Sequence, residues 1–310
     1  MTLRLAILCP GQGSQSAAMF DLGASDPAAM ARVQAWLRSA DGPVSQTPLS
    51  GLLAHPTAMF ENRCAQPLVV AATLMAWTML AERLPRPALV TGYSVGEISA
   101  YAIAGALPLD QAVGIAAQRA AIMSEASEAS GEQGLAALSG IAPQAALALA
   151  TQAGCAAAID TPGALIAGGL RANLDQLAKL SQHAGATCKP LPVHIASHTG
   201  LLAPAVDPLR ALLQVHARAP VLPLLAGVNA STIHDGAQAA ELLARQTANT
   251  IHWTDCLDAI AEARIDVALE LGPGNALTRM LRERHPEIAC RSVSDFRSVK
   301  GILAWVEAQA

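Results

Sequence analysis

Short apolar runs closed by glycine and proline turns recur along the chain, and helical patterns follow them. The pattern predicts buried strands over residues 3–8, within 86–94 and over 267–271, because each run is too short for a helix and ends at a turn. The second and third runs lead directly into segments with helical spacing. Buried strands that alternate with helices predict an α/β fold with a mostly parallel sheet covered on both faces.

The middle of the chain has a different order of elements. Residues 124–134 are small and polar, and we interpret them as a hinge. The pattern after them is strand, helix, strand, strand, helix, strand, which is the ferredoxin-like order βαββαβ. We interpret these elements as a small domain inserted into a larger one. They are expected over residues 135–139, 143–152, 156–159, 164–167, 174–183 and 187–192.

Composition predicts a large core and argues against nucleic acid as a partner. Of the 310 residues 52% are hydrophobic, and the formal net charge is -4. Lys and Arg are scattered, whereas nucleic-acid binders gather them on one face. The longest apolar run, residues 67–80, is shorter than the ~20 residues of a membrane-spanning helix. We therefore expect a buried core helix, no membrane partner and, because no signal peptide is recognisable, a cytoplasmic location.

The six cysteines show no metal-binding spacing. They form no Cys-x-x-Cys pair and have no histidine at zinc spacing. We expect mostly buried free thiols in a reducing compartment, and no metal site. The cysteines lie at positions 9, 64, 155, 188, 256 and 290.

One serine stands between two glycines, where a strand passes into a helix. The stretch Gly92-Tyr93-Ser94-Val95-Gly96 has the G-x-S-x-G pattern of a nucleophile elbow. Glycine suits a turn so tight that side chains at the flanking positions would clash. The backbone N–H of Val95 and the dipole of the following helix would then stabilise an oxyanion. The alternative is an exposed turn serine or a helix cap.

A nucleophilic serine needs a base, and His198 is the strongest candidate among eight histidines. It follows a predicted strand in a polar turn, where the small domain returns the chain to the larger one. The other seven lie upstream, on a strand, or in or beside predicted helices, where surface and cap roles are common. No carboxylate stands out as the partner that would orient the histidine. Asp207, Asp255, Asp258 and Glu270 all stay open for that role.

Several motifs occur together in the order found in malonyl-CoA:acyl-carrier-protein transacylases, and the chain resembles that family over nearly its whole length. They are CPGQGSQ, QPLVVAA, GYSVGEISAYAIAGAL, QRAAIMSEA, LPVHIASHTGLLAPAV, ARQTANTIHWTD and ELGPGNALTRML. The resemblance implies an α/β-hydrolase-like large domain of residues 1–128 and 197–310. It also implies a ferredoxin-like small domain of residues 129–196, which agrees with the pattern above.

The resemblance also implies a set of catalytic roles. Ser94 is expected to be the nucleophile and to form a malonyl ester, with His198 as the general base. A backbone carbonyl of the segment that holds Gln246 would meet the histidine in place of a carboxylate. The backbone N–H groups of Gln12 and Val95 would form the oxyanion hole.

The implied substrate site contains Arg119, Gln66 and the position of Tyr93. Malonyl carries a carboxylate at its far end, and a guanidinium can bind it through two parallel hydrogen bonds. Gln66 matches a glutamine that lines the site in this family. Tyr93 stands where members of fatty-acid synthesis usually carry histidine, so any positive charge at that position is lost. Cys9 replaces a usual phenylalanine, and Asp160 replaces a common asparagine.

Within the family, the GYSVGE and ASHT segments resemble the epsilon subunit of malonate decarboxylase. We therefore expect an enzyme that moves malonyl from malonyl-CoA to the thiol of a carrier-protein subunit, with other decarboxylase subunits as further partners. The alternatives are a housekeeping transacylase of fatty-acid synthesis, a serine thioesterase or esterase, and a non-catalytic scaffold. No bound cofactor is expected. The acceptor thiol would belong to 4'-phosphopantetheine or to a group derived from dephospho-CoA.

Overall fold

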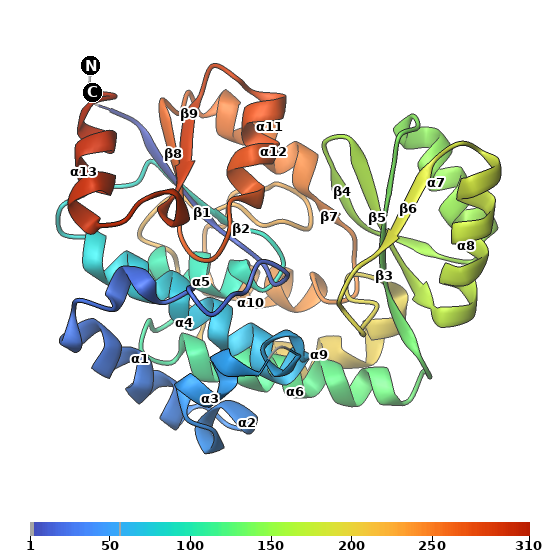
Figure 1. Cartoon of the computed structure of the whole chain (residues 1–310), viewed down its shortest axis with the longest axis horizontal. Helices are drawn as coiled ribbons and strands as arrows, with labels where there is room; N and C mark the ends of the chain where they lie inside the picture. The colour runs from blue at the N-terminus through green and yellow to red at the C-terminus, as the bar shows by residue number, and fades with distance from the viewer. Residues whose placement is uncertain (1–2, 56) are drawn as a thin grey trace.

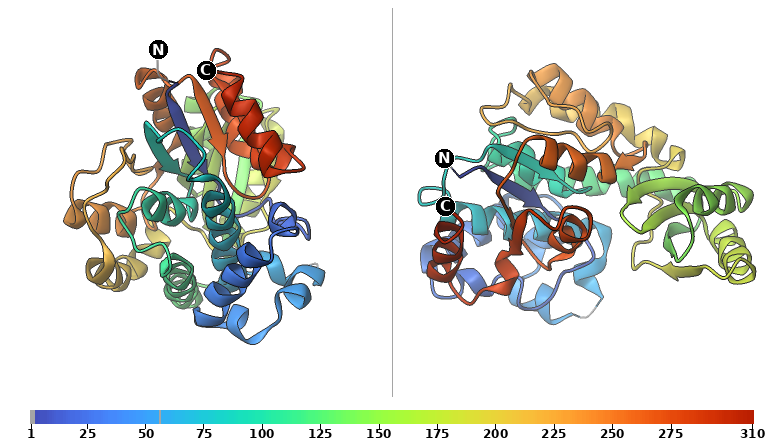
Figure 2. Two further views of the ribbon diagram at one scale, coloured as in Figure 1. Left: turned by 90° about the vertical axis from the view of Figure 1, so that its left-hand side faces the viewer. Right: turned by 90° about the horizontal axis from the view of Figure 1, so that it is seen from above.

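Two β-sheets, one in each of two bodies, organise the chain (Figure 1). This computed structural model describes residues 3–55 and 57–310. The larger body holds a parallel sheet, and the smaller body projects from one side of it. Figure 2 shows that the first strand, β1 (Leu5–Cys9), and the last helix, α13 (Val299–Glu307), both lie in the large body, away from the small one. The α/β class predicted from the sequence is confirmed.

The sheet of the large body is wholly parallel, in the order β2-β1-β8-β9. The side chains of β1, β2 and β8 are all buried, as expected for strands covered on both faces. The three strands expected from the sequence are confirmed, with ends displaced by one to a few residues. The bounds are β1 Leu5–Cys9, β2 Leu89–Gly92, β8 Val267–Glu270 and β9 Ala289–Ser292.

Successive residues of β1 (Leu5–Cys9) point to opposite faces of the sheet and enter two different apolar clusters. Leu5 and Ile7 pack in the cluster that includes α4, whereas Ala6 and Leu8 pack in the cluster that includes α11 and α12. The buried core helix expected over residues 67–80 is confirmed as part of α4. Among the described residues, no helix is long and apolar enough to cross a membrane. The helices of this body are α1 Pro27–Ser39, α2 Pro43–Gln46, α3 Leu49–Ala54, α4 Asn62–Leu80, α5 Gly96–Ile103, α6 Ala112–Glu128, α9 Ala203–His216, α10 Gly236–Arg245, α11 Trp253–Glu262, α12 Ala276–Arg284 and α13 Val299–Glu307.

The second sheet has the order β6-β3-β5-β4-β7, and its first four strands are antiparallel. Their connections follow the ferredoxin-like order predicted from the sequence. The fifth strand, β7 (Ile251–His252), pairs parallel with β4 and comes from outside the expected insert of residues 129–196. The small sheet therefore includes a strand that the expected division gave to the large domain. The other elements are β3 Gln133–Ser139, α7 Pro143–Gln152, β4 Ala156–Thr161, β5 Ala164–Leu170, α8 Arg171–His183 and β6 Thr187–Pro190.

The hinge predicted over residues 124–134 is wrong over most of its length. Helix α6 continues to Glu128 and β3 begins at Gln133, so the connection is only four residues long, 129–132. The helix continues into this segment because its end is buried. Ala126, with Met123 just before the segment, packs in an apolar cluster with Ile195, Leu202 and Ala205. Buried contacts thus outweigh the polar composition of the segment.

The turn from β2 into α5 depends on two glycines that have no room for a side chain. A Cβ on Gly92 would lie 2.3 Å from the carbonyl carbon of Gly96, and a Cβ on Gly96 would lie 2.1 Å from the Cys9 oxygen. Between them Ser94 has a φ of 56°, in the left-handed region that non-glycine residues rarely adopt. The serine is therefore held at a sharp bend packed directly against the end of β1.

We expect Gly96→Ala to destabilise the protein by about 2–3 kcal/mol, because the added methyl group meets fixed backbone atoms of the neighbouring strand. Gly114→Ala is the matched control, since a Cβ at that position in α6 has no neighbour within 4 Å. It should stabilise the protein by about 0.5–1 kcal/mol through helix propensity. Urea unfolding of both variants measures the difference, and equal effects would contradict the close packing of the turn.

Candidate active site

Ser94 and His198 come from different parts of the chain and lie in direct contact. The distance between Ser94 Oγ and His198 Nε2 is 2.8 Å. Ser94 follows β2, and His198 lies in the segment that returns from the small sheet toward α9. The backbone N–H of His198 donates to the carbonyl oxygen of Thr247 at 2.8 Å, which fixes this segment. His198 has a φ of 64°, so both residues of the pair have left-handed backbone conformations.

The tautomer of His198 follows from its second contact. Its Nδ1 lies 2.6 Å from the backbone oxygen of Gln246, and a carbonyl oxygen can only accept. Nδ1 must therefore carry the proton, which leaves Nε2 free to accept from the Ser94 hydroxyl. Burial, together with the positive charge of Arg119, lowers the pKa of His198 to about 3. The imidazole is neutral at neutral pH, which is the state required of a base.

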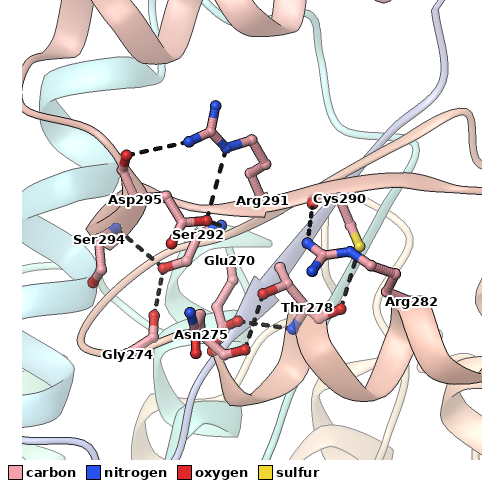
Figure 3. A network of polar contacts seen from close by, with 10 residues as sticks. All are labelled: Glu270, Gly274, Asn275, Thr278, Arg282, Cys290, Arg291, Ser292, Ser294 and Asp295. Atoms are coloured by element: carbon pink, nitrogen blue, oxygen red, sulfur yellow. Dashed lines mark hydrogen bonds and ion pairs between the residues drawn. The ribbon is translucent and has the colours of Figure 1, made fainter.

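The four carboxylates left open by the sequence are all engaged elsewhere. Asp207 pairs with Arg210, Asp255 lies beside His252, and Asp258 binds Arg284 and His285. Glu270 accepts from the backbone N–H groups of Leu277 at 3.2 Å and Thr278 at 2.8 Å, at the start of α12. Figure 3 shows Glu270 within that polar network. The group that orients His198 is thus a backbone carbonyl, which no side-chain pattern reveals.

Arg119, on α6, is buried and is held by two neutral amide groups. Its two terminal nitrogens donate to Gln66 Oε1 at 2.7 Å and to Gln246 Oε1 at 2.9 Å. Burial lowers the pKa of Arg119 to about 10, so it keeps its charge at neutral pH. Its Nε has no partner among the described residues. The guanidinium is therefore fixed in place without being neutralised by a directly bound carboxylate.

Two features of this cluster were missed by sequence reasoning. The side chain of Gln246 connects the other groups, because its Nε2 donates to the backbone oxygen of Ser94 at 2.8 Å. Glu97, on the first turn of α5, is completely buried and accepts from the Gly227 N–H at 2.9 Å. Burial raises the pKa of Glu97 to about 7, although the charge of Arg119 opposes the shift. No local motif points to either role, since both depend on contacts between distant segments.

The turn after β1 brings Gln12 close to the serine. A Cβ on Gly11 would lie 2.8 Å from the Tyr93 oxygen and 3.5 Å from Ser94 Cβ, so this turn packs against the elbow. Within residues 3–55 and 57–310, the backbone N–H groups of Gln12 and Val95 donate to no protein acceptor. Neither N–H group is thus occupied by an acceptor from these residues.

Tyr93 lies beside the serine in sequence, and its ring packs against Trp253. The ring meets that of Trp253 edge-on, with 5.2 Å between the centroids. In the part of the chain described, Tyr93 makes no hydrogen bond to Ser94, His198 or Arg119.

The same described residues contain no group of three or more His, Cys, Asp or Glu side chains placed to hold a metal ion.

We expect the acylation rate of Ser94 to be nearly independent of pH between about pH 5 and 8, because His198 stays neutral well below its ordinary pKa. Protonation should remove the base only as the pH falls toward about 3. Rapid-quench measurement of thiol release across this range tests the expectation. A half-maximal rate near the ordinary value of 6.5 would contradict it. A step near pH 7 that disappears in Glu97→Gln would belong to that carboxyl group instead.

Comparison with known proteins identifies one family over most of the chain. Residues 7–299 match the family model described as acyl transferase domain. A malonyl CoA-acyl carrier protein transacylase of Mycobacterium bovis is 32% identical over 294 residues, 93% of this chain and 96% of that protein. The crystal structure of the enzyme named MCAT from Mycobacterium tuberculosis has a TM-score of 0.88 and 31% identity, covering 98% of this chain and 99% of that one. An acyl-carrier-protein S-malonyltransferase from Burkholderia pseudomallei has a TM-score of 0.85 and 26% identity, covering 97% of this chain and all of that one.

Proposed function

The chain belongs to the acyl transferase family that includes the malonyl CoA-acyl carrier protein transacylases, and from this premise we propose that it transfers malonyl from malonyl-CoA to the thiol of an acyl carrier protein. The observation that carries the proposal is the contact between Ser94 and His198 beside the buried guanidinium of Arg119. A nucleophile with its base supports acyl transfer, and a fixed cation supports an acyl group that ends in a carboxylate.

In the first half of the reaction, the enzyme is acylated. His198 Nε2 takes the proton of Ser94 as Oγ attacks the thioester carbonyl, and the developing oxyanion accepts from the N–H groups of Gln12 and Val95. When the intermediate collapses, the carbon–sulfur bond breaks and the imidazolium returns its proton to the departing CoA thiolate. The products are free CoA and malonyl esterified to Ser94.

In the second half, the carrier thiol reverses the chemistry. It gives its proton to His198 and attacks the ester carbonyl, again with the oxyanion held by the two backbone N–H groups. The carbon–oxygen bond to Ser94 breaks, and the serine recovers its proton from the imidazolium. The backbone oxygen of Gln246 stabilises the imidazolium in both halves because it accepts from Nδ1–H at 2.6 Å.

Arg119 is proposed to recognise the distal carboxylate of malonyl. Its charge is kept at neutral pH, and its position is fixed by Gln66 and Gln246. A carboxylate offers the guanidinium charge-assisted hydrogen bonds, whereas an acetyl group leaves that buried charge without a partner. The arrangement therefore favours malonyl over uncharged acyl groups of similar size.

The acceptor is proposed to be an acyl carrier protein of the fatty-acid type. The relatives reported above are named transacylases of acyl carrier protein, which supports this alternative over a malonate decarboxylase subunit. The decarboxylase interpretation depends on the short segments GYSVGE, residues 92–97, and ASHT, residues 196–199, and it stays a prediction.

A direct competition between two carriers tests the acceptor. One carries 4'-phosphopantetheine and the other carries the group derived from dephospho-CoA, both with malonyl-CoA as donor. We expect kcat/KM to be at least about tenfold higher with the first. The opposite preference would assign the chain to a decarboxylase complex.

Steady CoA release without any carrier would instead indicate a hydrolase, whereas transfer predicts one stoichiometric burst.

A further inference from the structure

The direction in which the Gln66 side-chain amide points decides whether Arg119 has a hydrogen-bond acceptor on one side. A glutamine amide has an oxygen that accepts and a nitrogen that donates, at nearly the same distance from the backbone. As observed, Gln66 Oε1 accepts from Arg119 at 2.7 Å. Rotation of the amide by half a turn would place two donors face to face. The Arg119 hydrogen bond favours the observed direction, and a second contact that restrains the amide nitrogen would fix it more firmly.

Asn62, one turn earlier on α4, provides that restraint. Its Oδ1 accepts from Gln66 Nε2 at 2.7 Å, so the Gln66 nitrogen is drawn away from Arg119. The other contact of that nitrogen, Met123 Sδ at 3.5 Å, is only a weak acceptor. Among the described contacts, Asn62 is thus the strong acceptor for the Gln66 nitrogen.

The direction of the Asn62 amide is fixed in turn by the backbone of α6. Asn62 Nδ2 donates to the Ala120 oxygen at 2.9 Å and to Ser124 Oγ at 3.1 Å. The Ala120 carbonyl can only accept, so it requires the nitrogen of Asn62 to face it. The Ala120 oxygen thus orients Asn62, Asn62 restrains Gln66, and Gln66 accepts from Arg119. Arg119 and Ala120 are neighbours on the same helix.

The second acceptor of Arg119 is held by an independent contact of the same kind. Gln246 Nε2 donates to the backbone oxygen of Ser94 at 2.8 Å, which turns its Oε1 toward the guanidinium at 2.9 Å. Each glutamine that contacts Arg119 is therefore oriented through a backbone carbonyl. For Gln246 the restraint is direct, whereas for Gln66 it passes through one intermediate side chain.

We propose that Asn62 is a positioning residue for acyl-group selection, acting on Arg119 through the amide of Gln66. The proposal rests on the proposed function, because it assumes that Arg119 receives the malonyl carboxylate. Without Asn62, the Gln66 nitrogen keeps only the weak Met123 contact, so the amide and the Arg119 guanidinium that donates to it are held less firmly. Asn62 touches neither the serine nor the histidine, so the chemical step itself is left intact.

The test is Asn62→Leu, which has a similar volume and no amide. We expect the ratio of kcat/KM for malonyl-CoA to that for acetyl-CoA to fall about tenfold, through a higher KM for malonyl-CoA. The activity with acetyl-CoA should stay within about twofold of the original. Two variants serve as controls and should keep the ratio within about twofold. Thr73→Val removes a buried hydroxyl of α4 whose one hydrogen bond among the described residues is to its own helix, at the Val69 oxygen. Ser124→Ala leaves the Ala120 contact of Asn62 in place.

A double-mutant cycle separates orientation of the amide from a general structural effect. In the Gln66→Met background there is no amide for Asn62 to orient and no added charge beside Arg119, so adding Asn62→Leu should change the ratio by less than about twofold. An unchanged ratio in Asn62→Leu alone, an equal loss with both substrates, or the same loss in both backgrounds would overturn the proposal. If Asn62→Leu does not fold, Asn62→Ala serves for the same comparison. Malonyl transfer by the unchanged protein tests the proposed function separately.

Discussion

Ser94→Ala is expected to reduce malonyl transfer to the carrier by about 10⁴-fold or more, because the attacking oxygen is lost from both half-reactions. His198 has no other hydroxyl or thiol within hydrogen-bond distance among the described residues, so no neighbour can replace the serine. The measurement is carrier malonylation with malonyl-CoA as donor, alongside urea unfolding to show that the variant is folded.

Ser99→Ala is the matched control for this experiment. Ser99 is buried on α5, one turn beyond the elbow, and its hydroxyl has no partner in the described part of the chain. We expect its removal to change transfer by less than about threefold. Residual transfer by Ser94→Ala above about one per cent would contradict the covalent mechanism.

Arg119→Leu is expected to lower kcat/KM for malonyl-CoA by about 10²-fold or more, with a much smaller effect on acetyl-CoA. The leucine fills part of the space, but it leaves the carboxylate of malonyl in a buried site without a cation. Arg119→Lys should give an intermediate loss, because an ammonium keeps the charge but not the planar pair of donors. Initial rates with both acyl donors give the ratio directly.

Arg245→Leu is the control for Arg119→Leu, because it removes an arginine outside the buried site. It is exposed and immediately precedes Gln246, and we expect it to leave the ratio of the two acyl donors unchanged. An equal loss of activity with malonyl-CoA and acetyl-CoA in Arg119→Leu would show that the arginine stabilises the site without selecting the acyl group.

Periodic features of the sequence predicted the fold well. Strands β1 to β6, strand β8 and the core helix α4 were expected because burial imposes a regular apolar pattern on strands and helices, whereas the short strands β7 and β9 were not expected. The elbow was recognisable because only glycine fits at positions 92 and 96. The polar segment 124–134 was misread because its small residues are compatible with both a loop and a helix, and tertiary contacts of α6 decided the outcome.

The polar connections of the site could not be read from the sequence. His198 is oriented by a main-chain oxygen. Every residue possesses such an oxygen, so no side chain in the sequence identifies the partner of His198. The side chains of Gln246 and Glu97 act on residues more than 100 positions away, Ser94 and Gly227. The parallel pairing of β7 with β4 is equally long-range, and it joins the small sheet to the segment that follows Gln246.

The fold explains why these distant residues meet at one place. Ser94 follows β2 and Gln12 follows β1, and these strands are parallel neighbours, so both residues lie at the same edge of the sheet. Helices α4 and α6 bring Gln66 and Arg119 to that edge, and the return from the small sheet brings His198. The site thus lies at the edge of the large sheet, and His198 reaches it from the segment that leads back from the small sheet.

Mass spectrometry of the intact protein after brief exposure to malonyl-CoA, without a carrier, tests the central claim most directly. We predict one added malonyl group per chain, located on the peptide that contains Ser94 and removed when carrier protein is supplied. An unmodified protein that nevertheless malonylates its carrier, or a malonyl group found on any other residue, would contradict the account.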